Sequence, residues 1–128
     1  MKRSIMVVED DQPILDMMEI LLRRLGYEPR LSSNGISALA EIKTNPPALI
    51  LLDVMMMPIN GWEFLDMLRA DPVTKDLPVV LFTAHPSVEA TVAELRDQKL
   101  GVLLKPVTFS ELARALEQYL GKETATDR

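Results

Sequence analysis

The chain has 128 residues, of which 48% are hydrophobic and 26% charged, and its formal net charge is −5 at pH 7. This length and composition suit one compact domain with an ordinary hydrophobic core, and the negative charge argues against nucleic-acid binding through phosphate contacts. The chain contains no cysteine, which excludes disulfides, zinc thiolate sites and thiol catalysis.

Short apolar runs alternate along the chain with segments of helical periodicity. We expect strands, in chain order, at residues 5–8, 28–31, 49–52, 79–82 and 102–104, and the second of these has the weakest pattern. The stronger runs are rich in β-branched residues and leucine and do not alternate between apolar and polar positions. This pattern favours parallel strands that are buried on both faces.

Five amphipathic helices are expected between and after these strands. Their apolar positions are, in chain order, Ile14, Met17, Met18, Leu21, Leu22 and Leu25; Ile36, Leu39 and Ile42; Phe64, Leu65 and Leu68; Val88, Val92 and Leu95; and Leu112, Leu116 and Leu120. Pro13 and Gly26 mark the two ends of the first helix. Gly61 fits the turn that begins the third helix, and Ser110 or Thr108 is the expected cap of the fifth.

The strict alternation of strands and helices predicts an α/β fold, with a doubly wound, five-stranded parallel sheet and helices on both faces. In such sheets, ligands bind beyond the carboxyl ends of the strands. We expect one domain over residues 1–121 and a frayed C-terminal tail over residues 122–128, within the final sequence "GKETATDR".

The N-terminal sequence "MKRSIMVVEDDQ" has too few apolar residues before its acidic residues to be a signal peptide. The apolar stretch around Asp53 is too short and too interrupted to span a membrane. We therefore expect a cytoplasmic protein whose partners are proteins or cations.

Polar residues directly follow most of the predicted strands. In chain order they are Glu9, Asp10 and Asp11, then Asp53, Thr83 and Lys105. Because the carboxyl ends of parallel strands meet at one edge of a sheet, these side chains are expected to converge there. An ionised carboxylate such as Asp53 at the mouth of a buried strand costs free energy unless a positive charge meets it.

Four sequence motifs occur in order: "VVEDD" at 7–11, "LLDVMMMPINGWEFL" at 51–65, "PVVLFTAH" at 78–85 and "LKP" at 104–106. Together they resemble the receiver domain of two-component response regulators, of the chemotaxis type, and the resemblance covers almost all of residues 3–120. It implies that the domain at residues 1–121 is a receiver with the flavodoxin-like strand order 2-1-3-4-5. That order places the first and third strands side by side, which brings Glu9 and Asp10 next to Asp53.

The resemblance also implies a metal site. Asp10 and Asp53 bind the cation directly, Glu9 acts mainly through a metal-bound water, and the backbone carbonyl of Met55 completes the protein ligands. Three ionised carboxylates and Lys105 leave two negative charges, which one divalent cation neutralises. Oxygen ligands point to Mg²⁺, with Mn²⁺ as the alternative.

By the same resemblance, Asp53 is the nucleophile that takes a phosphoryl group from a phosphohistidine of a sensor histidine kinase or phosphotransfer protein, forming an acyl phosphate. Lys105 offsets the charge of the transferring group, and Thr83 donates its hydroxyl to a phosphoryl oxygen of the product. Ala84 is small and leaves room for the phosphodonor.

Each residue alone has an ordinary structural interpretation. Asp53 could cap the loop after its strand, Thr83 could be a common strand-end threonine, and Lys105 a surface lysine. We interpret Asp11 as a helix-start residue rather than a ligand, because a carboxylate is favourable there. His85, the single histidine, is interpreted as a loop residue beside the site rather than as a base.

Two positions depart from the family pattern. Receivers usually carry an aromatic residue three positions before the lysine, where this chain has Val102. Because valine has no ring to swing behind Thr83, either the following loop and helix carry the signal or the coupling is weaker. The family's proline, usually four residues beyond the aspartate, is replaced by Met57, with Pro58 next; we expect a modest shift of that loop.

The Lys105–Pro106 peptide is expected to be cis, as is common in the family.

The predicted function is a phosphorylation-controlled signalling switch that assists its own phosphorylation and dephosphorylation and is not otherwise an enzyme. Its downstream protein partner binds the face formed by the fourth helix, fifth strand and fifth helix. We expect no direct nucleic-acid or membrane binding, and the chain is either free-standing or cut from a longer regulator.

Two other functions are compatible with parts of the sequence. A phosphohydrolase with an aspartyl-phosphate intermediate typically needs a second acid two residues after the nucleophile, where this chain has Met55. A degenerate receiver that acts as a phosphorylation-independent scaffold is opposed by the intact site residues but favoured by Val102. Nucleotide binding is disfavoured because no glycine-rich phosphate loop follows any strand.

Overall fold

The structure is a computed structural model that describes residues 2–121; the predicted tail at residues 122–128 lies outside the described residues. The strands are β1 (Ser4–Val8), β2 (Glu28–Ser32), β3 (Leu49–Asp53), β4 (Val79–Thr83) and β5 (Leu100–Leu104). The helices are α1 (Gln12–Arg24), α2 (Gly35–Thr44), α3 (Gly61–Ala70), α4 (Ser87–Leu95) and α5 (Phe109–Leu120). The predicted alternation is confirmed. None of these helices combines the length and the apolar character that crossing a bilayer requires.

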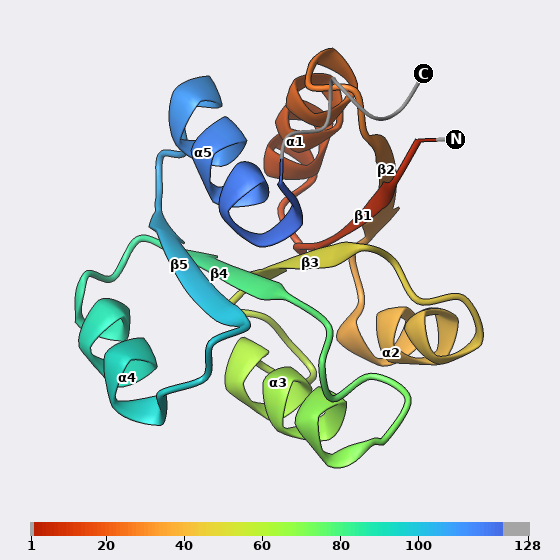
Figure 1. Cartoon of the computed structure of the whole chain (residues 1–128), viewed down its shortest axis with the longest axis vertical. Helices are drawn as coiled ribbons and strands as arrows, with labels where there is room; N and C mark the ends of the chain where they lie inside the picture. The colour runs from red at the N-terminus through yellow and green to blue at the C-terminus, as the bar shows by residue number, and fades with distance from the viewer. Residues whose placement is uncertain (1, 122–128) are drawn as a thin grey trace.

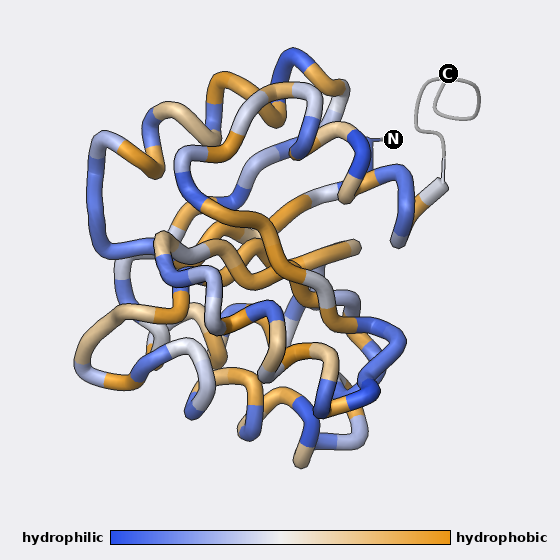
Figure 2. The backbone as a smooth tube through the Cα atoms, turned by 90° about the vertical axis from the view of Figure 1, so that its left-hand side faces the viewer, coloured by the Kyte–Doolittle hydropathy of each residue, from blue (hydrophilic) through white to orange (hydrophobic). Residues whose placement is uncertain are grey.

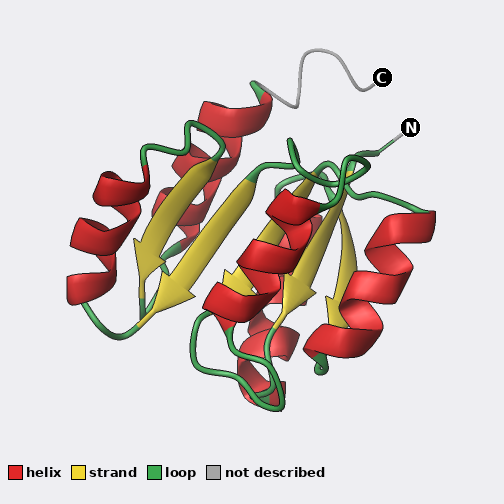
Figure 3. Cartoon of the chain, turned by 90° about the horizontal axis from the view of Figure 1, so that it is seen from below, coloured by secondary structure: helices red, strands yellow, loops and turns green. Residues whose placement is uncertain are grey.

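The five strands form one parallel sheet in the order β2-β1-β3-β4-β5, as predicted. Helices α1 and α5 cover one face of the sheet, and α2, α3 and α4 cover the other (Figure 1). All five strands end at the same edge of the sheet, where their arrowheads lie together (Figure 3). Loops that follow the strands therefore share this edge.

Both faces of the sheet are packed, which explains why the strands lack alternation. All five residues of β3 are buried. Ile50 and Leu52 belong to the core cluster under α2, α3 and α4, whereas Leu49 and Leu51 belong to the cluster under α1 and α5. The hydrophobic backbone segments accordingly run through the middle of the molecule (Figure 2).

The predicted apolar faces of three helices need correction. In α2, Ile36 is 56% exposed, and Ala38 is fully buried in its place. Leu95 in α4 and Met17 in α1 are also exposed, at 51% and 39%. Hydropathy periodicity favours the larger apolar residue, but a helix packed closely on a sheet can turn a small residue inward.

Helix starts were predicted more accurately. The cap of α5 is Thr108 rather than Ser110, because the Thr108 hydroxyl accepts the N–H of Glu111 at 3.1 Å. The Glu111 carboxylate accepts the Thr108 N–H at 3.1 Å in return, which completes a capping box. The predicted cis peptide at Lys105–Pro106 is present.

Candidate functional site

The predicted polar residues meet at the carboxyl edge of the sheet. Asp53 is the last residue of β3 and Thr83 the last residue of β4. Glu9 directly follows β1, where its N–H donates to the carbonyl of Ser32 at 3.0 Å. Lys105 directly follows β5, and its N–H donates to the Thr83 carbonyl at 2.8 Å. The backbone hydrogen bonds between neighbouring strands therefore fix the main-chain positions from which these side chains extend.

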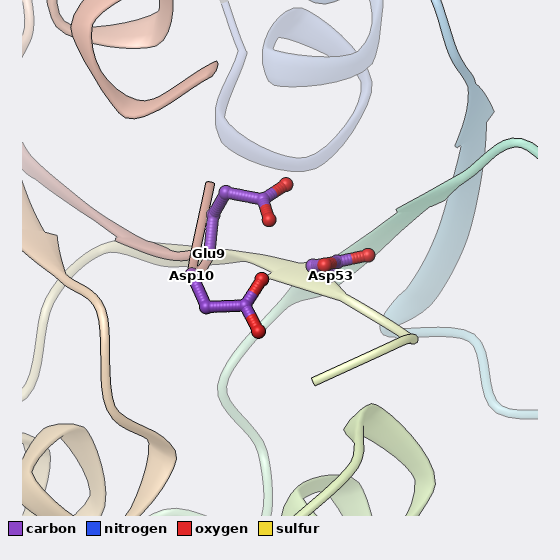
Figure 4. Close-up of side chains that lie close together, drawn as sticks. All are labelled: Glu9, Asp10 and Asp53. Atoms are coloured by element: carbon purple, nitrogen blue, oxygen red, sulfur yellow. The ribbon is translucent and has the colours of Figure 1, made fainter. Parts of the chain in front are cut away.

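Three carboxylates lie together at this edge. Glu9, Asp10 and Asp53 each offer one oxygen, and these oxygens lie within 4.8 Å of one another. Figure 4 shows the side chains of Glu9 and Asp10 extending from one strand end beside Asp53 on the neighbouring strand. Glu9 and Asp53 are buried, with 1% and 3% exposure, whereas Asp10 is exposed. Hard oxygen donors grouped in this way fit a divalent cation such as Mg²⁺.

Lys105 supplies the positive charge that a buried carboxylate needs. Its Nζ lies 3.0 Å from Glu9 Oε1 and 3.4 Å from Asp53 Oδ1, and its side chain is 24% exposed. The same ammonium lies 5.1 Å from the centre of the Phe82 ring. The sequence predicts Phe82 only as a strand residue, and the packed structure adds its contact with Lys105. A ring face next to a partly desolvated ammonium stabilises the charged form of the lysine.

Crowding shifts the proton affinities of these groups. Burial raises the pKa of Glu9, and the Asp53 carboxyl raises it further against the opposing hydrogen bond from Lys105. Desolvation and then the Glu9 carboxyl raise the pKa of Asp10. Burial acts to lower the pKa of Lys105, but the hydrogen bond to Glu9 and the charge of Asp53 outweigh it, so its pKa is raised. The cluster therefore carries excess negative charge that a cation can offset.

Because the pKa values of Glu9 and Asp10 are raised, the folded state binds protons more tightly than the unfolded chain. Without metal, the free energy of unfolding should fall as pH rises through and above the ordinary carboxyl range. Mg²⁺ should reverse this loss. At about 100 times its dissociation constant it should add about 2.7 kcal/mol near neutral pH, and much less at acid pH, where protons compete with it.

The Asp10→Asn variant tests this assignment by chemical denaturation with and without Mg²⁺. The variant should be more stable than the unmodified chain without metal and should lose most of the gain from Mg²⁺. Asp11→Asn is the matched control, because Asp11 is the next residue but lies outside the cluster. A full Mg²⁺ gain in Asp10→Asn would contradict the role of Asp10 as a ligand.

Thr83 is buried, with 1% exposure, and its hydroxyl oxygen accepts the backbone N–H of His85 at 3.1 Å. The hydroxyl proton of Thr83 stays available for donation to another acceptor. The contact from His85 uses its backbone and not its imidazole. This hydrogen bond links the site to the loop that leads into α4.

The loop after β3 begins beside the Asp53 carboxylate. The N–H of Met55 donates to Asp53 Oδ1 at 3.2 Å, while the Met55 side chain is 64% exposed. The Met57–Pro58 peptide is cis. The Met55 backbone therefore lies next to the Asp53 carboxylate through its N–H, and the role of its carbonyl as a metal ligand stays a prediction.

An open, mainly apolar hollow of about 490 Å³ borders the site on the side of α1. Its lining includes Ile14, Met17, Ala84, Lys105 and Val107. Ala84 lines this hollow and is exposed, directly after Thr83.

The model of the response regulator receiver domain family matches residues 5–117. The chain is 33% identical over 117 residues to the phosphate regulon transcriptional regulatory protein PhoB of Klebsiella pneumoniae, a match that covers 91% of this chain and 51% of that protein. The chain is also 33% identical over 117 residues to the transcriptional regulatory protein ZraR of Klebsiella oxytoca, and this match covers 91% of this chain and 26% of that protein. The chain thus spans about a quarter to a half of the length of these curated relatives.

Two solved structures are also similar. The N-terminal domain of a response regulator receiver protein from Methanoculleus marisnigri JR1 is 37% identical, with a TM-score of 0.75 and coverage of 92% of this chain and 96% of that one. The receiver domain of sensor histidine kinase PA1611 from Pseudomonas aeruginosa PAO1, with magnesium in its active site cleft, is 27% identical, with a TM-score of 0.83 and coverage of 94% and 99%. Among the curated relatives above are transcriptional regulators, so the chemotaxis type is not confirmed.

Proposed function

The chain belongs to the response regulator receiver domain family, and on that premise we propose that it is the phosphoacceptor of a two-component phosphorelay. The observation that carries the proposal is the buried Asp53 carboxylate, which lies 3.4 Å from the Lys105 ammonium and within the acidic cluster. Receiver domains are signalling phosphoacceptors rather than enzymes that turn over an external substrate. In this proposal the receiver occupies residues 1–121 and acts in the cytoplasm.

In the transfer step, an oxygen of Asp53 attacks the phosphorus of a phosphohistidine on a sensor histidine kinase or phosphotransfer protein. The new P–O bond forms as the P–N bond breaks, and the electron pair of the broken bond returns to the imidazole nitrogen of the donor. Lys105 neutralises negative charge that gathers on the phosphoryl oxygens. The Thr83 hydroxyl donates to one of those oxygens in the product.

Asp10, Asp53 and the carbonyl of Met55 would hold the divalent cation directly, and Glu9 would act through a water. When bound, Mg²⁺ would supply positive charge that offsets the charge of the phosphoryl group. The hard oxygen donors of the acidic cluster support this assignment, as does the magnesium in the similar PA1611 receiver domain. With the cation held by these residues, the domain would assist both its own phosphorylation and the later hydrolysis of the acyl phosphate.

The apolar hollow beside Lys105 supports a protein phosphodonor, because it offers contact area next to the reacting carboxylate. The net charge of −5 opposes direct binding to nucleic acid or to an anionic membrane surface. We therefore propose a kinase or phosphotransfer protein upstream and a second protein downstream.

The output is proposed to be a shift of α4, β5 and α5 between two arrangements that exist before phosphorylation. Val102 packs half-buried against the core cluster that contains Val88 of α4 and brings no aromatic ring. The hydrogen bond from the His85 N–H to Thr83 connects the site to α4 more directly than Val102 does, because α4 begins two residues after His85. Helix α4 has no side-chain cap and buries only Val88, so it is held weakly.

The second candidate is a receiver-like scaffold that binds its partner without phosphorylation, and Val102 is the observation that favours it. Incubation with Mg²⁺ and a small phosphodonor such as phosphoramidate, followed by intact mass, decides between the two. A magnesium-dependent phosphoryl adduct that maps to Asp53 supports the phosphoacceptor. Partner binding without uptake of a phosphoryl group supports the scaffold, and steady turnover of an external phosphoester would identify a phosphohydrolase.

A further inference from the structure

Gly61 begins α3 in direct contact with the backbone at the end of β3. Its N–H donates to the carbonyl of Val54 at 2.9 Å. A Cβ atom built on Gly61 would lie 2.7 Å from Val54 Cα and 2.8 Å from the carbonyl oxygen of Asp53. Both neighbours are backbone atoms, so a side chain at this position requires the peptide that joins Asp53 to Val54 to move.

Glycine is required at position 61 because there is no room for a Cβ atom next to the β3 backbone. The described glycines with positive φ are Gly26 and Gly121, and Gly61 is not among them. The sequence predicted that a side chain would be costly at Gly61, and the close backbone contacts, rather than a positive φ, give the reason. The close approach is also rigid, because the Asn60 side chain accepts the Glu63 N–H at 2.9 Å and the Glu63 carboxylate accepts the Asn60 N–H at 2.9 Å.

We propose that Gly61 is a positioning residue for phosphoryl transfer, an inference that rests on the proposed function. Its missing side chain lets the first turn of α3 hold the Asp53–Val54 peptide in place. That peptide directs the Asp53 carboxylate and starts the loop whose Met55 N–H bonds Asp53 Oδ1 at 3.2 Å. Gly61 thereby sets the separation between the Asp53 carboxylate and the Met55 peptide.

Gly35 provides a matched control within the same chain. It is also the first residue of a helix and also follows an asparagine cap, Asn34, so an alanine changes helix propensity in the same way at both positions. A Cβ on Gly35 would meet side-chain atoms only, the nearest being Ile59 Cγ1 at 2.9 Å. A side chain can turn away, whereas a strand backbone cannot without disturbing the sheet.

The test compares Gly61→Ala with Gly35→Ala by circular dichroism, by Mg²⁺ titration calorimetry, and by the rate of phosphorylation from phosphoramidate as a function of Mg²⁺. For Gly61→Ala we expect a folded protein with Mg²⁺ affinity weakened by about tenfold or more. Its phosphorylation rate at saturating Mg²⁺ should fall by about 10- to 100-fold. Gly35→Ala should keep the Mg²⁺ affinity and the rate of the unmodified chain, even where its thermal stability changes.

Unmodified Mg²⁺ affinity and rate in a folded Gly61→Ala protein would overturn the proposal, as would equal losses in both variants. If the unmodified chain takes up no phosphoryl group, the proposed function fails, and the Mg²⁺ affinities of the two variants still decide the role of Gly61. Should Gly61→Ala not fold, amide hydrogen exchange of the unmodified chain provides the test. Saturating Mg²⁺ should slow exchange of the Gly61 N–H, and an unchanged exchange rate there would overturn the coupling.

Discussion

Replacing Asp53 with asparagine is expected to abolish phosphoryl uptake while leaving the fold intact. Asparagine has nearly the same shape, and its carbonyl oxygen can still accept the Met55 N–H that now bonds Asp53 Oδ1. It has no anionic oxygen to attack phosphorus, and loss of the covalent nucleophile of a serine protease lowers its rate by about 10⁶-fold. Intact mass after incubation with Mg²⁺ and phosphoramidate should therefore show no adduct.

The matched control is Asp66→Asn, which removes an exposed carboxylate on α3, away from the acidic cluster. This control should take up phosphoryl groups at the rate of the unmodified chain. A phosphoryl adduct that persists in Asp53→Asn would mean that another residue is the acceptor. Thermal unfolding of both variants should be measured first, because a loss of fold would also remove the adduct.

Replacing Lys105 with methionine is expected to slow phosphorylation by about 10²–10³-fold, which corresponds to about 3–4 kcal/mol of lost transition-state stabilisation. Methionine keeps the apolar stem but removes the ammonium that lies 3.0 Å from Glu9 and 3.4 Å from Asp53. The rate should be measured at saturating Mg²⁺, so that a change in metal affinity does not contribute.

The same substitution also tests the role of Lys105 in stability. Because the pKa of Lys105 is raised in the folded state, its contribution is present at neutral pH and is lost only above its ordinary value of 10.5. Leaving the buried Glu9 without its partner should lower the free energy of unfolding by about 1–3 kcal/mol near pH 7. The deficit should shrink at acid pH, where the carboxylates accept protons.

Mg²⁺ separates the two effects of the Lys105→Met substitution. Added Mg²⁺ should restore much of the lost stability, because it supplies positive charge to the same carboxylates, but it should not restore the rate. Lys105→Arg, which keeps the charge with a different shape, should retain more of the rate than the methionine variant. If Lys105→Met is phosphorylated as fast as the unmodified chain, Lys105 has a structural role only.

The prediction of the fold succeeded where local patterns are strong. The runs at residues 49–52 and 79–82 lack alternation because both faces of the sheet are covered, and both became central strands, β3 and β4. The prediction failed at Ile36 in α2, which is exposed while Ala38 is buried. Periodicity identifies a helix and its approximate face, but the side chains that touch the sheet depend on how the helix is rotated against it.

The candidate site was predictable as a set of residues and not as a geometry. The motifs placed Glu9, Asp53 and Lys105 at the ends of strands, and a parallel sheet brings such ends to one edge. That Lys105 lies within reach of both carboxylates, over the Phe82 ring, required the packed structure.

The alternation of strands and helices, the polar residues at the strand ends and the absence of thiol chemistry can all be read from the sequence alone. These features depend on residue type and on spacing along the chain, which the sequence states directly. The packed fold was needed to establish three other features: the contact between Gly61 and the Asp53–Val54 backbone, the rotation of α2, and the distances among the charged groups. Such contacts join residues that are not neighbours in the sequence, and their separations are set by how close-packed helices and strands fit together.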